Sequence, residues 1–271
     1  MNVFEFIPDG TRDCTVTAWL HENEKFPEIA GYAYKRPAII ICPGGGYDVI
    51  AEREGEPVAK CYFAAGYDTF ILRYSVKDMA KDFYPLCQLA ATVAHIRKYA
   101  DSWNIDRKKV VVSGFSAGGH LACSLGTLFN ESKFLSVFGR ADDIRPNAMV
   151  LSYPVITADE YAHTDSIRTV SGAEIGTEEY KWFGLDTHVD SETSPAFIWH
   201  TAEDAVVPVE NSLKFAAALS KEKVLYELHV LPEGEHGLSV CNQEVNTPNA
   251  YNGRWVEWSI KWLEKVLQFE V

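Results

Sequence analysis

Val110-Val111-Val112-Ser113-Gly114-Phe115-Ser116-Ala117-Gly118 joins a run of β-branched residues to a G-x-S-x-G motif. The valines predict a buried strand, and the small residues after the motif predict a helix that continues to about Phe129. A serine between a strand and a helix lies on a sharp turn that presents its hydroxyl above a sheet, and the flanking glycines avoid a clash there. This stretch therefore predicts that Ser116 is a nucleophile.

The segments around this motif alternate between predicted strands and predicted helices. Such alternation is typical of an α/β fold with a mostly parallel sheet and helices on both faces. Near the N-terminus, Cys14–His21 alternates like an antiparallel strand, for which 31–35 is a candidate partner. The predicted strands are Pro37–Cys42, Asp68–Tyr74, Val110–Val112, Asn147–Tyr153, Phe197–His200 and Val224–Leu231, and the predicted helices are Glu54–Ala65, Tyr84–Trp103, Asn211–Ser220 and Trp255–Phe269.

No linker, repeat or low-complexity segment divides the chain, so we expect a single domain over residues 1–271. The one long irregular segment, Ile156–Thr193, is polar and lies between two predicted core strands. Irregular segments of this length inside a domain are usually lids or binding loops. We therefore predict that this segment is a small cap insertion over the carboxyl edge of the sheet.

The chain is strongly acidic, with 38 acidic residues, 25 basic residues and a formal net charge of −13. This charge disfavours nucleic acids and anionic membranes as partners, and no apolar run is long enough to span a bilayer. The first ten residues do not resemble a signal peptide, and the six cysteines form no C-x-x-C pair. We expect a cytoplasmic protein with reduced cysteines that acts on a small molecule without metal or cofactor; whether it is a homodimer is left open.

A serine hydroxyl needs a general base, and the best candidate is His236. It lies in Pro232-Glu-Gly-Glu-His-Gly237, a polar turn directly after the last predicted strand. His200 and His229 belong to predicted strands and are expected to be structural. His120 falls in the first turn of the helix after Ser116, where it should point away from the attack face.

The base in turn needs an acid that fixes its tautomer, and in this kind of fold the acid lies between the serine and the histidine in the chain. Asp204 fits this order, because it follows the predicted strand Phe197–His200. Glu203 is the adjacent alternative. Asp186 and Asp190 are weaker candidates because they belong to the irregular insertion.

Attack on a carbonyl group produces an oxyanion that requires backbone N–H donors. One donor should be the N–H of Ala117, directly after the nucleophile. The others should come from Pro43-Gly-Gly-Gly-Tyr47, the glycine-rich loop after the strand Pro37–Cys42. Glycines allow the backbone to approach a substrate oxygen closely.

From about Ala38 to the C-terminus, the chain resembles the bacterial acetyl esterase/lipase family of α/β-hydrolases, which includes carbohydrate deacetylases of the acetyl-xylan esterase type. The resemblance implies an α/β-hydrolase fold, the catalytic residues Ser116, Asp204 and His236, and oxyanion N–H groups from Gly45, Gly46 and Ala117. Pro43 replaces the histidine of the lipase branch, so the sugar-esterase branch is more similar. The motifs that carry the resemblance are Pro43-Gly-Gly-Gly-Tyr47, Gly114-Phe-Ser-Ala-Gly-Gly-His120, Tyr153-Pro-Val-Ile-Thr157, His200-Thr-Ala-Glu-Asp204 with Val207-Pro208, and Gly234-Glu-His-Gly237.

Three aromatic residues are candidates for substrate contact: Tyr47 after the glycine loop, and Trp182 and Phe183 in the insertion. They could stack on a sugar ring or line an acyl pocket, but packing of the cap explains them equally well. The short insertion argues against a large lipase lid. We therefore expect a serine esterase for short-chain carboxylic esters, with acetyl esters of sugars as the leading substrate class.

Two other functions fit the same fold. An amidase, peptidase or formamidase would use the same three residues, so only its leaving-group pocket would differ. A non-catalytic binding protein would be expected to lack at least one of the three, and all are present. Metal-dependent hydrolysis is set aside because no H-E-x-x-H or similar ligand spacing occurs.

Overall fold

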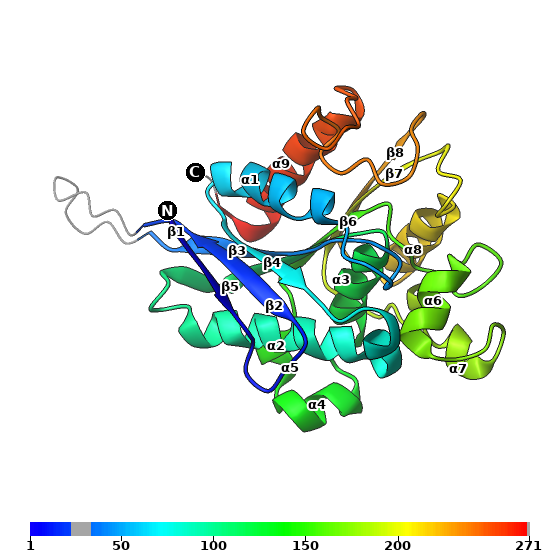
Figure 1. Ribbon diagram of the computed structural model, residues 1–271, viewed down its shortest axis with the longest axis horizontal. Helices are drawn as coiled ribbons and strands as arrows, with labels where there is room; N and C mark the ends of the chain where they lie inside the picture. Colours follow the sequence, from blue (N-terminus) through cyan, green and yellow to red (C-terminus); the bar gives the residue numbers. More distant parts are fainter. Residues whose placement is uncertain (23–33, 270–271) are drawn as a thin grey trace.

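The computed structural model describes residues 1–22 and 34–269, and within these residues a single sheet contains eight strands (Figure 1). The strand order across the sheet is β1-β2-β4-β3-β5-β6-β7-β8. Each of the six strands predicted for the body of the sheet is present. The strands are β1 (Asn2–Phe6), β2 (Thr15–Leu20), β3 (Arg36–Cys42), β4 (Asp68–Arg73), β5 (Ile105–Phe115), β6 (Ala148–Ser152), β7 (Ala196–Thr201) and β8 (Tyr226–Leu231).

The sheet is mixed, because its N-terminal strands run opposite to the rest. Neighbouring strands from β4 to β8 pair in parallel, whereas β2 pairs antiparallel with both β1 and β4. The sequence predicted β2 but not this pairing. Of its suggested partner 31–35, residues 31–33 lie outside the described residues and 34–35 are not in a strand. Instead β2 is held between β1, a short outer strand, and β4.

Helices cover both faces of the sheet, as predicted for this fold class. Side chains of β3 alternate between the two cores: Ile40 belongs to the core that includes residues of α2, α3 and α8, while Ile39 and Ile41 belong to the core that includes residues of α1 and α9. Figure 1 shows α1 and α9 together on one side of the sheet and α2 on the other. The longer helices are α1 (Glu56–Ala64), α2 (Tyr84–Tyr99), α3 (Ala117–Leu128), α8 (Glu210–Lys221) and α9 (Trp255–Leu267), and two short helices that the sequence did not predict are α4 (Ser132–Phe138) and α5 (Ala141–Ile144).

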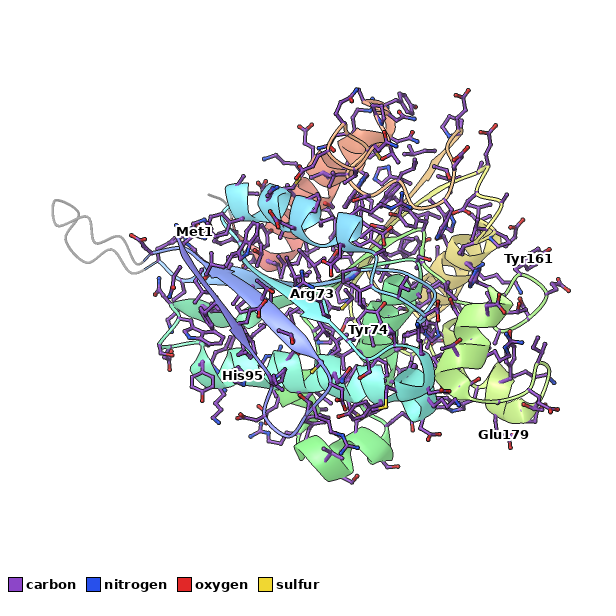
Figure 2. All side chains as sticks on the ribbon, in the orientation of Figure 1. Met1, Arg73, Tyr74, His95, Tyr161 and Glu179 are labelled. Carbon is purple, nitrogen blue, oxygen red and sulfur yellow. The ribbon has the colours of Figure 1, made fainter. Side chains whose placement is uncertain are left out.

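The predicted insertion 156–193 folds into short helices rather than an irregular loop. It contains α6 (Thr164–Ser171), α7 (Glu178–Lys181) and the 3-10 turn η3 (Leu185–Thr187). These helices stand at one end of the sheet, next to another 3-10 segment, η2 (Lys77–Phe83), with Tyr161 and Glu179 at the outer border (Figures 1 and 2). Gly172, with φ of 68°, is the C-cap of α6.

The topology gathers three segments at the same edge of the sheet. Parallel strands have their carboxyl ends at a common edge, where ligands of open α/β sheets bind. Ser116 directly follows β5, and Asp204 and His236 lie in the loops after β7 and β8. Residues far apart in the sequence are thereby brought to one place.

Candidate active site

Ser116 lies on a tight turn between β5 and α3. Its φ of 53° and ψ of −118° are unusual for a residue with a side chain, and its side chain retains only 8% exposure. A Cβ atom at Gly114 would overlap the carbonyl oxygen of Gly118, and one at Gly118 would overlap the carbonyl oxygen of Cys42. The turn therefore requires both glycines, which explains their positions two residues before and after the serine.

The structure brings together the three residues that the sequence predicted as nucleophile, base and acid. His236 Nδ1 lies 2.6 Å from Asp204 Oδ2, and His236 Nε2 lies 2.8 Å from Ser116 Oγ. The ionised carboxylate can only accept, so Nδ1 carries the proton of the neutral imidazole. Nε2 is then left with a lone pair that can accept the proton of the Ser116 hydroxyl.

Asp204 is held by donors on both of its oxygens. Oδ1 accepts hydrogen bonds of 2.9 Å from the backbone N–H groups of Val206 and Val207, while Oδ2 faces His236 and lies 3.2 Å from His200 Nε2. Burial raises the pKa of Asp204, but the contacts with His200 and His236 outweigh burial and hold the pKa well below its usual range. Asp204 is therefore a fixed negative charge beside the histidine.

The rival acids have other partners. Glu203 is exposed, and its Oε2 accepts a 3.4 Å hydrogen bond from the N–H of Gly234. Asp190 Oδ1 accepts from the N–H of Glu192 within the insertion, and burial raises the pKa of Asp186. The geometry thus distinguishes Asp204 from its neighbour and from the acids of the insertion.

The rival histidines have structural contacts. His200 is buried, with Nδ1 2.8 Å from Ser212 Oγ and Nε2 2.9 Å from the carbonyl oxygen of Val207. His229 stacks on Trp258 at 4.5 Å between ring centroids. His200 nevertheless touches Asp204, a contribution to the acid's environment that its position in a strand did not reveal.

The glycine loop after β3 lies beside Ser116, because a Cβ atom at Gly44 would be 3.0 Å from Ser116 Cβ. Gly45 and Gly46 have φ of 120° and 67°, and the carbonyl oxygen of Gly45 accepts from the N–H groups of Asp48 and Val49. Within the described part of the chain, the N–H groups of Gly45, Gly46 and Ala117 have no acceptor among the backbone contacts that close this loop. These are the groups expected for an oxyanion hole.

Tyr47 is not available to a substrate, which corrects the prediction that it contacts one. Its side chain is fully buried, and its hydroxyl donates a 2.9 Å hydrogen bond to His120 Nδ1. His120 Nε2 must carry the ring proton because its partner, 2.9 Å away, is the carbonyl oxygen of Phe183. Burial lowers the pKa of His120 to about 4, so the ring is neutral. His120 thereby ties the glycine loop to the insertion.

The two aromatic residues predicted in the insertion have different environments. Phe183 is only 8% exposed and packs against Phe83, with ring centroids 4.6 Å apart. Trp182 is 38% exposed and rests edge-on against His188. Trp182 can therefore contact a ligand, whereas Phe183 mainly packs the insertion onto the body.

His163, which the sequence analysis did not single out, lies on the insertion side of the site. Its Nδ1 accepts from the N–H of Ser166 at 3.4 Å as the N-cap of α6 and also lies 2.8 Å from Ser166 Oγ. Burial lowers the pKa of His163, and His236 lowers it further. A Cβ atom at Gly46 would lie 3.8 Å from Ser166 Oγ, so this end of α6 lies against the glycine loop. A histidine in a polar loop carries no sequence signal for this position.

Glu54 and Tyr153 were also missed as site residues, although Tyr153 belongs to one of the motifs quoted above. Glu54 is buried, and its carboxylate binds both the N–H of Gly44 and the hydroxyl of Tyr153. Tyr153 packs edge-on against His236 with 5.0 Å between ring centroids. A glutamate at the start of a predicted helix normally indicates an exposed first turn, so the sequence pointed away from burial.

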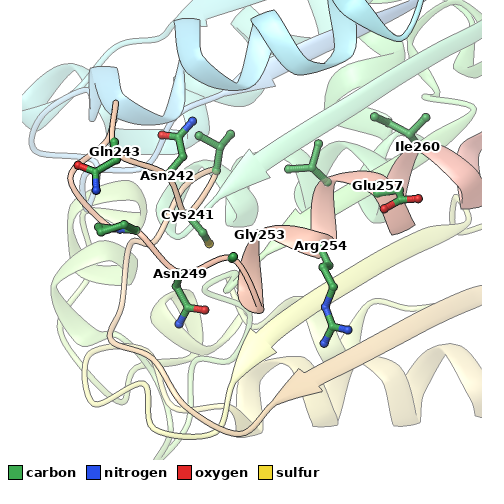
Figure 3. A pocket seen from close by; sticks show the side chains of 12 residues that line it. Cys241, Asn242, Gln243, Asn249, Gly253, Arg254, Glu257 and Ile260 are labelled. Atoms are coloured by element: carbon green, nitrogen blue, oxygen red, sulfur yellow. The ribbon is translucent and has the colours of Figure 1, made fainter.

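A pocket of about 830 Å³ lies elsewhere, between the segment 240–250 and α9 (Figure 3). Its lining residues all fall between Val240 and Ile260 and include none of the three triad residues. The pocket is therefore separate from the place where an ester bound at Ser116 would lie.

The described residues contain neither a candidate membrane span nor a candidate metal cluster. Over residues 1–22 and 34–269, no helix has the length and apolar character required to cross a membrane. In the same residues, histidine, cysteine and acidic side chains form no group of three or more that could hold a metal ion. No disulfide joins the cysteines of the described residues.

The chain is similar to proteins whose names refer to xylan and to esters. The sequence profile of the BD-FAE family matches residues 30–219. Endo-1,4-beta-xylanase B of Butyrivibrio fibrisolvens is 39% identical over 89% of this chain, and an acetylxylan esterase of Xylanibacter ruminicola is 30% identical over 74%. The matched regions make up only 36% and 40% of these two relatives, so the chain spans well under half of their length.

Solved structures match over nearly the whole chain. The carboxylesterase Cest-2923 from Lactobacillus plantarum has a TM-score of 0.85 at 27% identity, covering 98% of each chain. An acetyl ester-xyloside bifunctional hydrolase from Caldicellulosiruptor lactoaceticus has a TM-score of 0.79 at 33% identity, covering 93% of this chain and 88% of its own. These likenesses confirm the predicted fold and the predicted resemblance to esterases of the acetyl-xylan esterase type. The chain belongs to the BD-FAE family and has the α/β-hydrolase fold of carboxylesterases.

Proposed function

We propose that this protein is a serine esterase that hydrolyses short-chain carboxylic esters, with Ser116 as nucleophile, His236 as general base and Asp204 as the orienting acid. The hydrogen-bonded series from Asp204 through His236 to Ser116, with distances of 2.6 and 2.8 Å, carries this proposal. The names of the relatives and structural neighbours, which are esterases and carboxylesterases, support the same reaction class.

The reaction follows from the proton positions. His236 Nε2 takes the proton of Ser116 as Oγ attacks the ester carbonyl carbon, and Asp204 stabilises the imidazolium that forms. The carbonyl oxygen becomes an oxyanion, for which the N–H groups of Gly45, Gly46 and Ala117 are the proposed donors. Collapse of this intermediate expels the alcohol, which receives the proton from His236. Water then attacks the acyl-enzyme by the same steps and releases the acid.

Acetyl esters of sugars are the proposed substrate class. An acetylxylan esterase and an acetyl ester-xyloside hydrolase are among the similar proteins. The insertion is short, and the start of α6 lies against the glycine loop at Gly46, which favours a small acyl group over a long chain. The half-exposed Trp182 offers a ring face of the kind on which sugars stack.

The test is a panel of substrates assayed with purified protein. It consists of p-nitrophenyl esters from acetate to palmitate, acetylated xylo-oligosaccharides, p-nitroanilides and p-nitrophenyl xyloside. We expect the highest kcat/KM for acetate among the nitrophenyl esters, and release of acetate from the oligosaccharides. A preference for anilides would indicate an amidase, and a preference for long chains a lipase; either result would reject the proposed substrate class.

A further inference from the structure

Glu54 is a buried carboxylate between the glycine loop and the base. It is the last residue of the 3-10 turn η1 (Glu52–Glu54) and retains only 2% exposure. Its Oε2 accepts a 2.8 Å hydrogen bond from the N–H of Gly44, and its Oε1 accepts a 2.7 Å hydrogen bond from the hydroxyl of Tyr153. Burying such a group costs free energy unless its hydrogen bonds are made. Its placement therefore calls for a reason beyond folding.

The donors around Glu54 are fixed by their other partners. The hydroxyl oxygen of Tyr153 accepts a 2.8 Å hydrogen bond from the N–H of Ser239, so its own proton is free to point at Glu54. The N–H of Gly44 can only donate. Both carboxylate oxygens consequently act as acceptors. Burial raises the pKa of Glu54, and the hydrogen bonds from Tyr153 and Gly44 oppose that rise.

Each oxygen of Glu54 connects to a different part of the site. A Cβ atom at Gly44 would lie 2.7 Å from Glu54 Oε2 and 3.0 Å from Ser116 Cβ, so the carboxylate is beside the residue that opens the glycine loop next to the nucleophile. On the other side, the ring of Tyr153 packs on His236 at an interplanar angle of 70°. Glu54 thus contacts both Gly44, in the loop that carries the proposed oxyanion donors, and Tyr153, which packs against the base His236.

We propose that Glu54 is a positioning residue for the acyl-transfer site, holding the glycine loop through Gly44 and the ring of His236 through Tyr153. The inference rests on the proposed function, because it presumes that Ser116 and His236 react. It does not depend on which ester is the substrate. Shifts of about 1 Å in reacting groups can cost on the order of 10²-fold in rate.

The decisive variant is Glu54→Gln. A glutamine can still accept from Gly44, but its amide group then faces Tyr153, whose hydroxyl proton loses its acceptor. For p-nitrophenyl acetate we expect kcat to fall about 10²-fold, while KM changes by less than about threefold, because the loop and base matter most in the transition state. A purely structural role would lower thermal stability without this selective loss of kcat in the folded protein.

Tyr153→Phe provides a second route if Glu54→Gln does not fold. It keeps the ring beside His236 but removes the hydroxyl that donates to Glu54 and accepts from the N–H of Ser239, and it should lower kcat about tenfold. Combined with Glu54→Gln it should add little, because both changes break the same connection. Glu52→Gln is the matched control: Glu52 lies on the same turn, is exposed and pairs with Arg73 at 2.8 Å, and its kcat should stay within about twofold of the parent.

The rate at which a fluorophosphonate labels Ser116 separates this inference from the proposed function, because labelling needs the nucleophile, base and oxyanion donors but no particular ester. Slow labelling of folded Glu54→Gln, with parental labelling of Glu52→Gln, supports the positioning role even if the ester panel fails. Labelling and kcat of both Glu54→Gln and Tyr153→Phe within about threefold of the parent would overturn it.

Discussion

The sheet edge and the insertion surround the same serine with different kinds of structure. On the sheet side, Ser116, Asp204 and His236 each follow a strand, and Asp204 has donors on both oxygens. On the insertion side, short helices carry a half-exposed Trp182 and a helix-capping His163. The first region holds its polar atoms in fixed positions, whereas the second leaves side chains open to solvent.

This difference separates two tasks. Acyl transfer needs groups held to within fractions of an ångström, which rigid strands and well-bonded side chains provide. Selection among acyl and alcohol groups needs surface that a ligand can touch, and loops and insertions usually supply it. Changes on the sheet side should therefore lower the rate for every substrate, and changes at exposed insertion positions should alter the ranking of substrates.

The largest effect is expected at the nucleophile. Ser116→Ala should lower kcat by about 10⁶-fold, because no other group can form the acyl-enzyme, while the folded structure remains. Steady-state assays with p-nitrophenyl acetate measure the rate, and thermal unfolding checks the fold. More than a few per cent of parental activity in the purified variant would show that another residue is the nucleophile.

The next largest effect is expected at the acid. Asp204→Asn should cost on the order of 10⁴-fold in kcat, because an amide can donate to His236 and favour the wrong tautomer. Glu203→Gln is the matched control, since the carboxylate of Glu203 is exposed and accepts a hydrogen bond from the N–H of Gly234. A larger loss of kcat in Glu203→Gln than in Asp204→Asn would show that Glu203, not Asp204, is the acid.

Much of the sheet side could be predicted from the sequence, because its signals are local. A valine run and a strand–serine–helix motif identify Ser116, and the order of strands along the chain leads to Asp204 and His236. The antiparallel pairing of β2 was not predictable, since it depends on β1, a five-residue strand with weak alternation.

The insertion side, and the residues that hold the loop and the base in place, were harder to predict from the sequence. They depend on contacts between segments that are far apart in the chain. The position of Tyr47 after the glycine loop suggested contact with a substrate. Its side chain is instead buried, and its hydroxyl donates a hydrogen bond to His120, 73 residues later in the chain. Glu54 and Tyr153 are 99 residues apart. No periodicity or motif records such pairs. Sequence alone also could not distinguish Trp182 from Phe183.

Trp182 and Phe183 allow a direct comparison of how much an exposed and a buried aromatic side chain contribute to stability. Phe183→Ala should reduce the free energy of unfolding by about 3–5 kcal/mol, the range for truncating a buried phenylalanine. Trp182→Ala should cost less, because Trp182 is already 38% exposed. Urea unfolding of both variants measures the difference. A loss at Trp182 equal to or above that at Phe183 would contradict the assignment of Phe183 as the packing residue.

The smallest effect, and the sharpest test of the two-region comparison, concerns selectivity at Trp182. We expect the exposed ring of Trp182 to contact the substrate, so removing it should change discrimination between substrates by about 1–3 kcal/mol. Trp182→Ala should therefore change the ratio of kcat/KM between acetylated xylo-oligosaccharides and p-nitrophenyl acetate by roughly 10- to 100-fold, with the small ester hardly affected. The control is Val137→Ala on α4, which truncates another exposed apolar side chain, 68% exposed, outside the insertion. If kcat/KM fell equally for every substrate, Trp182 would support the reaction itself, like the residues of the sheet side. If kcat/KM were unchanged for every substrate, selectivity would depend on other residues of the insertion.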